Sequence, residues 1–248
     1  AFLALLFAVF RKPTHIRANL GMIALIAVFA SALPFLLLAY AAQTVTASVL
    51  VIMNATAPIW AAAIAVVWTR TLPPPKAMLG LLLGLIGVGL IVGLDTHTLN
   101  TPGTGLGLLA ASGGAACYGL ATNMATHMGK QIDSKSYALG CLVLGSAMLL
   151  PWVPFALPAQ VPSWPAVLAT VGVGVLCSGL AYLIYFRLVQ DVGPTSALTV
   201  TFLTPVFGVL WGHVLLGEAV GWHTVAGGLT VIAGTGLAAV YGLQKTSG

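Results

Sequence analysis

Long apolar runs alternate along the whole chain with short segments rich in Pro, Gly or charge. Most runs are about 20 residues long, the length that an α-helix needs to cross a bilayer core of about 30 Å. Helices are expected because backbone polar groups cannot stay unpaired in lipid, and the sequence lacks the short alternating strands of a β-barrel. The pattern predicts a partial helix and eight spans: Ala1–Phe10, Leu20–Ala42, Ala47–Thr69, Ala77–Leu94, Gly105–Met128, Ser136–Leu157, Trp164–Leu188, Ser196–Gly217 and Trp222–Leu243. The expected fold is an all-α, polytopic transmembrane helical bundle.

Composition supports this fold and excludes most soluble classes. Of 248 residues, 59% are hydrophobic and 5% are charged, and the mean hydropathy is +1.06. A soluble domain carries about 25% charged residues. The net charge of +5 comes from nine Lys and Arg that stand singly or in pairs between apolar runs, so no nucleic-acid partner is expected. The three cysteines lack CxxC or CxxH spacing, so neither a disulfide framework nor a metal or other cofactor is expected.

All nine basic residues fall in every second loop between the predicted spans. In chain order the groups are Arg11, Lys12 and Arg17; Arg70 and Lys76; Lys130 and Lys135; Arg187; and Lys245. Loops rich in Lys and Arg face the cytoplasm. The distribution predicts a cytoplasmic C-terminus and an integral protein of a bacterial inner (plasma) membrane.

The chain also repeats itself at an offset of 147 residues. In one ungapped register the polar and special residues pair as Ser31 with Ser178, Gln43 with Gln190, Pro58 with Pro205, Gly80 with Gly227, Gly87 with Gly234 and Gly89 with Gly236. We therefore predict a first repeat over residues 1–94, a linker over 95–104 and a second repeat over 105–248. In this register the first repeat lacks its first helix and most of its second, and Ala1–Phe10 is the end of that second helix. Ten helices, five in each half, would give the halves opposite orientations in the membrane.

Several stretches resemble a known family in their order and spacing. In the second half these are GVGVLCSGLAYLIYFR (172–187), GPTSA (193–197), FLTPV (202–206) and LLGE (215–218). Together with the glycine-rich last span they resemble the second EamA domain of the drug/metabolite transporter superfamily, and residues 47–87 resemble the first. The resemblance implies ten helices, paired inverted halves, and export or exchange of metabolites. The first half departs from it by having Arg70-Thr71 where the second has Gly217-Glu218, so the acidic residue at that helix end is absent there.

Paired prolines mark the candidate substrate site. Pro58 and Pro205 lie near the middle of their spans, and proline leaves the carbonyl four residues earlier without its usual donor. Those carbonyls belong to Asn54 and Thr201, and matching helix breaks point to a binding site in transporters with inverted repeats. A packing kink is the alternative. Polar and aromatic residues that would complete the cavity are Ser31, Tyr40, Trp60, Tyr118, Asn123, Ser178, Tyr182 and Trp211. Each of these alone has a structural or interfacial alternative.

The remaining polar and small residues leave alternatives open. The four acidic residues lie in loops or at helix ends, which disfavours a buried proton relay. His213 is the titratable residue that lies well inside a span. It could form a hydrogen bond in a cavity or act as a proton switch. The alternative is a neutral side chain that is bonded to a nearby backbone or hydroxyl group. The glycine-rich faces of residues 80–93 and 227–236 would pack helices together, in a homodimer or between the two halves.

The function most consistent with these features is a secondary transporter. A small polar or zwitterionic solute, such as an amino acid, would bind near Pro58 and Pro205 and cross by alternating access between the halves. The alternatives are an exporter of hydrophobic drugs or lipids, and a membrane protein without transport function. An enzyme is disfavoured, because the sequence shows no HExxH motif, paired buried carboxylates or Ser-His-Asp arrangement. The expected partners are the solute and the lipid bilayer.

Overall fold

A computed structural model describes residues 19–72, 74–94, 102–128, 134–155, 162–180, 184 and 203–243. Within these ranges all regular structure is helical and there is no strand, which confirms the predicted all-α class. Among the described residues, three segments are long and apolar enough to cross a membrane: Leu20–Ala41, Ala47–Thr69 and Thr104–His127. The predicted partial helix Ala1–Phe10 lies outside the described residues.

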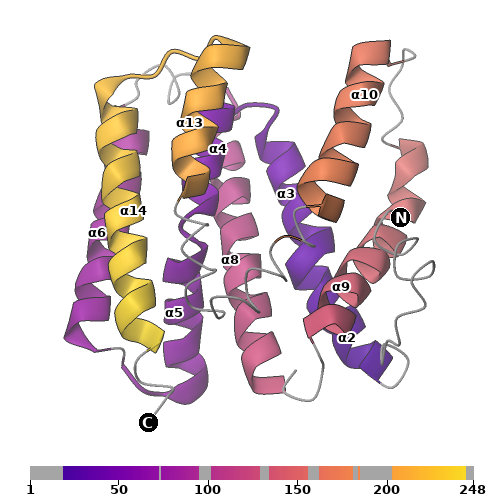
Figure 1. Cartoon of the computed structure of the whole chain (residues 1–248). Helices are drawn as coiled ribbons and strands as arrows, with labels where there is room; N and C mark the ends of the chain where they lie inside the picture. The colour runs from indigo at the N-terminus through magenta and orange to yellow at the C-terminus, as the bar shows by residue number, and fades with distance from the viewer. Residues whose placement is uncertain are drawn as a thin grey trace. The chain divides into compact units, whose positions relative to one another are not determined.

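The chain divides into two compact units, and Figure 1 labels their helices. One unit comprises Ala1–Val28 and Gly129–Thr199, and the other Phe29–Met128 and Val200–Gly248. The described helices of the first unit are α2 (Leu20–Ala27), α9 (Ser134–Leu149), the 3₁₀ segment η3 (Leu150–Phe155), α10 (Trp164–Gly172) and the π segment η4 (Val173–Leu180). The second unit holds most of the π segment η2 (Val28–Ala32), followed by α3 (Leu33–Ala41), α4 (Ala47–Asn54), α5 (Ala57–Thr69), α6 (Pro75–Leu94), α8 (Thr104–Met128), α13 (Leu203–Leu216) and α14 (Trp222–Leu243).

Helix boundaries follow the hydrophobic pattern closely, but several predicted spans change geometry or break within their length. The prediction of one α-helix over Ser136–Leu157 is wrong at its end, where α9 stops at Leu149 and a 3₁₀ segment follows. Pro151 and Pro154 explain the change, because neither supplies the N–H that an α-helix needs there. In the predicted span Trp164–Leu188, α10 gives way to π geometry at Val173, and no proline accounts for that change.

The two π segments occur at matching positions of the 147-residue register. Residues 28–32, shifted by 147, correspond to residues 175–179, which lie inside η4. The first segment precedes Pro34, which sits in the first turn of α3 and leaves the carbonyl of Ala30 without its usual donor. Single-turn π segments in α-helices are frequent at functional sites. Ser31 and Ser178 both lie in these segments.

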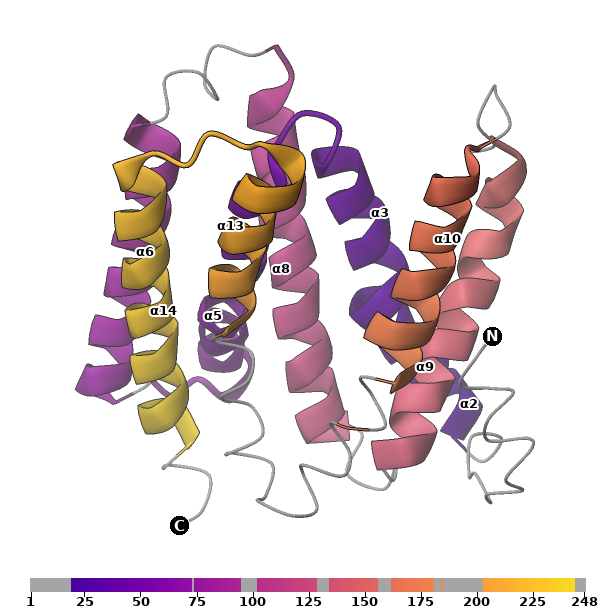
Figure 2. The same ribbon diagram turned by 45° about the horizontal axis from the view of Figure 1, so that its top comes forward.

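In the second unit, α6 and α14 pack along their lengths (Figures 1 and 2). A Cβ atom built on Gly87 would lie 2.7 Å from the carbonyl oxygen of Gly227 and 2.7 Å from the nitrogen of Val231. Small residues permit this separation of the helix backbones. The glycine-rich faces therefore meet within the chain and join helices from the two predicted halves, while the homodimer stays a prediction.

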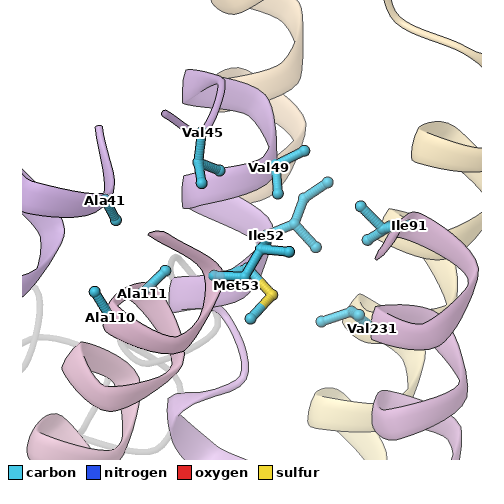
Figure 3. Packing of buried hydrophobic residues seen from close by; sticks show 10 residues of the cluster. Ala41, Val45, Val49, Ile52, Met53, Ile91, Ala110, Ala111 and Val231 are labelled. Carbon is cyan, nitrogen blue, oxygen red and sulfur yellow. The ribbon is translucent and has the colours of Figure 1, made fainter. Parts of the chain in front are cut away.

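The apolar core of this unit surrounds α4 (Figure 3). Val49, Ile52 and Met53 project from α4 towards Ile91 of α6 and Val231 of α14. On the other side, α3 and α8 contribute small residues that include Ala41, Ala110 and Ala111. Helix α4 is thus packed on several sides within the unit.

Two helices of this unit end in the left-handed backbone conformation. Arg70 has φ of 54° and donates its N–H to the carbonyl of Val66 at the end of α5. Gly217 has φ of 66° and donates to the carbonyl of His213 at the end of α13. This is a common C-terminal cap, in which glycine avoids the steric cost that arginine meets. Arg70 and Gly217 are 147 residues apart, the offset of the predicted repeat.

Candidate functional site

The predicted break before Pro58 is present in the structure. Helix α4 ends at Asn54, residues 55–56 form a turn, and α5 begins at Ala57 with Pro58 in its first turn. Proline is tolerated in a first turn because its missing N–H has no intrahelical partner there. Thr56 stabilises the turn: its Oγ1 donates to the carbonyl of Met53 at 2.6 Å, and its own carbonyl accepts from the N–H of Ile59 at 2.8 Å.

At this break, the side-chain oxygen of Asn54 has no donor among the described residues. This oxygen, Oδ1, is buried. One other buried side-chain atom in the described residues shares this property, the hydroxyl oxygen of Thr44 in the α3–α4 turn. A hydroxyl can rotate to a new partner, whereas an amide oxygen held at a helix end has less freedom. A buried acceptor without a donor costs about 1–3 kcal/mol, so a solute that supplies an N–H or O–H would be stabilised here.

Pro205 lies on a helix that packs against α4. It occupies the third position of α13 and is fully buried. The two helices approach closely enough for a Cβ on Gly208 to meet the side chain of Val51 at 2.6 Å. The structure thus brings together the helices that carry Asn54 and Pro205. The predicted break at Thr201 lies outside the described residues.

Asn123 joins α8 to α5. Its Nδ2 donates to the carbonyls of Ala61 at 2.8 Å and Gly119 at 2.9 Å. At this level Gly119 lies against the backbone of Trp60 and Ala61, with no room for a Cβ. Both donors of the buried amide are therefore used in helix packing, which favours a structural role over solute binding.

The other predicted site residues differ in burial. Ser31 is buried in η2, and Tyr118 is partly buried on α8. Three of the predicted aromatic site residues have exposed fractions of 38–50%: Tyr40, Trp60 and Trp211. Large exposed aromatic side chains suit a lipid-facing or interfacial position. The side chain of Ser178 and the whole of Tyr182 are not among the described parts.

His213 does not lie well inside its helix, contrary to the prediction. It occupies the last turn of α13, which the left-handed Gly217 ends after Leu216. Its side chain is exposed, and Nδ1 lies 3.0 Å from the carbonyl oxygen of Glu218. Because a carbonyl only accepts, Nδ1 donates in this bond. This geometry is the backbone-bonded alternative to a proton switch.

Glu218 has a structural role that the sequence interpretation did not assign. Its Oε1 accepts from the N–H of Ala47 at 2.6 Å, and its Oε2 accepts from the N–H and hydroxyl of Ser48 at 3.0 and 2.6 Å. The carboxylate thus caps the first turn of α4 from the end of α13. The available signal was the departure from the repeat, where Thr71 stands in place of an acid.

Comparison with known proteins identifies the family. The model of the EamA-like transporter family matches residues 1–93 and 105–240. The chain belongs to the EamA-like transporter family. It is an integral membrane protein of a transporter family, as the resemblance of its motifs implied.

Two curated relatives carry matching names. An "Uncharacterized transporter" of Archaeoglobus fulgidus is 26% identical over 163 residues, which cover 64% of this chain and 56% of the relative. The "Uncharacterized transporter YvbV" of Bacillus subtilis is 26% identical over 159 residues, which cover 62% of this chain and 50% of the relative. The matches thus span about half the length of these relatives.

A solved structure shares the fold. It is titled "Crystal structure of protein", and it aligns with a TM-score of 0.60 at 17% sequence identity over 96% of this chain and 80% of its own. Among the described residues of the predicted site, the buried side-chain acceptor without a donor is the Oδ1 of Asn54, at the end of α4.

Proposed function

We infer that this transporter is a carrier that moves a small polar or zwitterionic metabolite across the membrane by alternating access between two inverted halves. The solute binds at the turn between α4 and α5. The observation that carries this proposal is the buried Oδ1 of Asn54, which accepts no hydrogen bond from the described residues. It lies where Pro58 interrupts the helix, so the carbonyl of Asn54 also lacks its usual donor.

These two acceptors define the kind of solute. An amide oxygen and a backbone carbonyl both require a donor, which an ammonium, amide or hydroxyl group supplies. A hydrocarbon would leave the buried amide oxygen unpaired in a water-poor site, at a cost of about 1–3 kcal/mol. The turn therefore favours a donor-bearing metabolite over a hydrophobic drug or lipid.

The predicted repeats are the two parts that would move relative to each other during alternating access. Helices α4 and α13 come from different predicted repeats, residues 1–94 and 105–248, and each carries one of the paired prolines or leads directly into it. Rocking one repeat against the other would change the packing between them and expose the turn to each side in turn. The basic loops support a cytoplasmic C-terminus in an inner (plasma) membrane, with export or exchange as the direction.

The test is transport by the complete protein in proteoliposomes. The panel contains amino acids, polyamines and sugars as donor-bearing solutes, and apolar dyes as the opposing class. We expect protein-dependent, saturable uptake or efflux of at least one donor-bearing compound, with none in protein-free liposomes. Transport of dyes alone would replace the proposal with a drug exporter, and transport of nothing by folded protein would overturn it.

A further inference from the structure

The carboxylate of Glu218 joins two helices that are far apart in sequence. It lies just beyond the end of α13 and reaches the first turn of α4, 170 residues away. Three hydrogen bonds of 2.6–3.0 Å connect it to Ala47 and Ser48. Ser48 is buried and Glu218 is partly buried, so water competes weakly for this contact.

The contact completes the capping of α4. Thr46 precedes the helix, accepts the N–H of Val49 on its side-chain oxygen and accepts the N–H of Leu50 on its carbonyl. The N–H groups of Ala47 and Ser48 remain, and these are the two that Glu218 accepts. A negative charge at a helix N-terminus is also favoured by the helix dipole. The contact is therefore strong for a single side chain.

The surrounding residues are suited to this contact. A Cβ on Gly212 would lie 2.5 Å from the hydroxyl oxygen of Ser48 and 2.6 Å from Oε2 of Glu218, so only glycine leaves room at that position. The loops predicted to face the same side, residues 42–46, 95–104, 158–163 and 217–221, contain no Lys or Arg. With no basic residue in those loops, the N-terminus of α4 is the positive partner of the carboxylate.

We propose that Glu218 is the latch of the outer gate. Its carboxylate holds the outer ends of α4 and α13 together while the carrier is closed on that side, and it leaves the α4 N-terminus when that side opens. The proposal rests on the alternating access proposed above and on the predicted topology, which places both helix ends on the outer face. Thr71, the counterpart of Glu218 in the first repeat, has no carboxylate, so the latch acts on one side only.

Sided labelling of a cysteine introduced below the latch tests the proposal. Val51 lies at the contact between α4 and α13, one turn below Ser48. Val51→Cys therefore reports whether reagents from outside reach that contact. An impermeant maleimide is added from the outside to vesicles of known orientation, and labelling of the same protein without Val51→Cys is subtracted. Glu218→Ala is expected to raise the labelling rate of the introduced thiol by about five- to thirtyfold, the effect of losing a strong charged cap. Glu218→Gln keeps one acceptor and should give a smaller rise.

Two control variants separate a latch from simple helix stabilisation. Thr46→Ala weakens the start of α4 without touching α13, and Thr71→Ala alters the counterpart position. Both should leave outside labelling within about twofold of the parent, because neither removes a bond between the two helices. An equal rise in Thr46→Ala and Glu218→Ala would reduce Glu218 to a helix cap and overturn the latch.

A second variant keeps the test decisive if Glu218→Ala does not fold. Ser48→Ala removes one of the three bonds and leaves both backbone donors in place, and it should raise labelling about two- to fivefold. If folded Glu218→Ala is labelled at the parental rate, the latch is overturned. If Glu218→Ala does not fold, an unchanged labelling rate in Ser48→Ala overturns it. Labelling does not depend on transport. If Glu218→Ala raises labelling in a protein that transports nothing, the proposed function is contradicted and the proposal for Glu218 is still supported.

Discussion

The packing of α6 on α14 can be tested with two alanine substitutions two residues apart. Gly87 is buried at the contact, and its added Cβ would lie 2.7 Å from the oxygen of Gly227 and from the nitrogen of Val231. Ordinary contacts of a Cβ begin at 3.4 Å, so the helices must separate by about 0.7 Å, which loses dispersion along the interface. Gly89 is exposed on the same helix, and its added Cβ meets nothing within 4 Å.

The two variants share their effect on helix propensity, which favours alanine over glycine by about 1 kcal/mol. The difference between them therefore isolates the contact. Overpacking costs about 1–3 kcal/mol, so Gly87→Ala should be less stable than Gly89→Ala by about that amount. The assay is unfolding of the purified protein in detergent micelles, followed by circular dichroism during a denaturant titration. Equal stabilities within about 0.5 kcal/mol would refute this account of the α6–α14 contact.

Three further substitutions test other contacts by the same unfolding assay. Asn123→Leu leaves the Ala61 carbonyl without its side-chain donor and should cost about 1–3 kcal/mol, whereas a smaller loss would argue that the tie between α5 and α8 is dispensable. Arg70→Gly should raise stability by about 0.5–1 kcal/mol by relieving the left-handed backbone at φ 54°, and no gain would show that the arginine makes a compensating contact. Gly212→Ala should destabilise by about 1–3 kcal/mol, because its Cβ enters the space of the Ser48 hydroxyl and the Glu218 carboxylate; a neutral effect would contradict that packing.

Much of the helical framework could be predicted because it depends on local chemistry. Span length follows from bilayer thickness, and the described helices begin and end within a few residues of most predicted limits. The break before Pro58 was predictable for the same reason, since proline acts on its own helix. The predicted α-helix over Ser136–Leu157 was too long because Pro151 and Pro154 lack the N–H groups that would continue α9.

Contacts between distant segments could not be predicted from the pattern. The hydrophobic runs place Glu218 at a helix end, but they do not show that the N-terminus of α4 lies beside it, 170 residues away. The partners of the Asn123 amide depend on tertiary packing in the same way. The glycine faces were predicted to pack helices together, but the pattern did not decide between a homodimer and the contact within the chain that the structure shows. The prediction for His213 was wrong because a hydrophobic run does not show where the chain turns. In the structure the left-handed Gly217 ends α13 and brings the carbonyl of Glu218 next to the His213 side chain.

The central claim is that a solute binds at Asn54, and its most direct test is the Michaelis constant for the first compound that the protein transports. Asn54→Ala should raise KM about five- to 150-fold, as expected for loss of a buried hydrogen bond of about 1–3 kcal/mol. Thr201→Ala, at the predicted counterpart, should also alter transport, while Asn123→Ala should leave the KM of its folded fraction near the parental value. Unchanged transport in both Asn54→Ala and Thr201→Ala would contradict binding at the paired helix breaks.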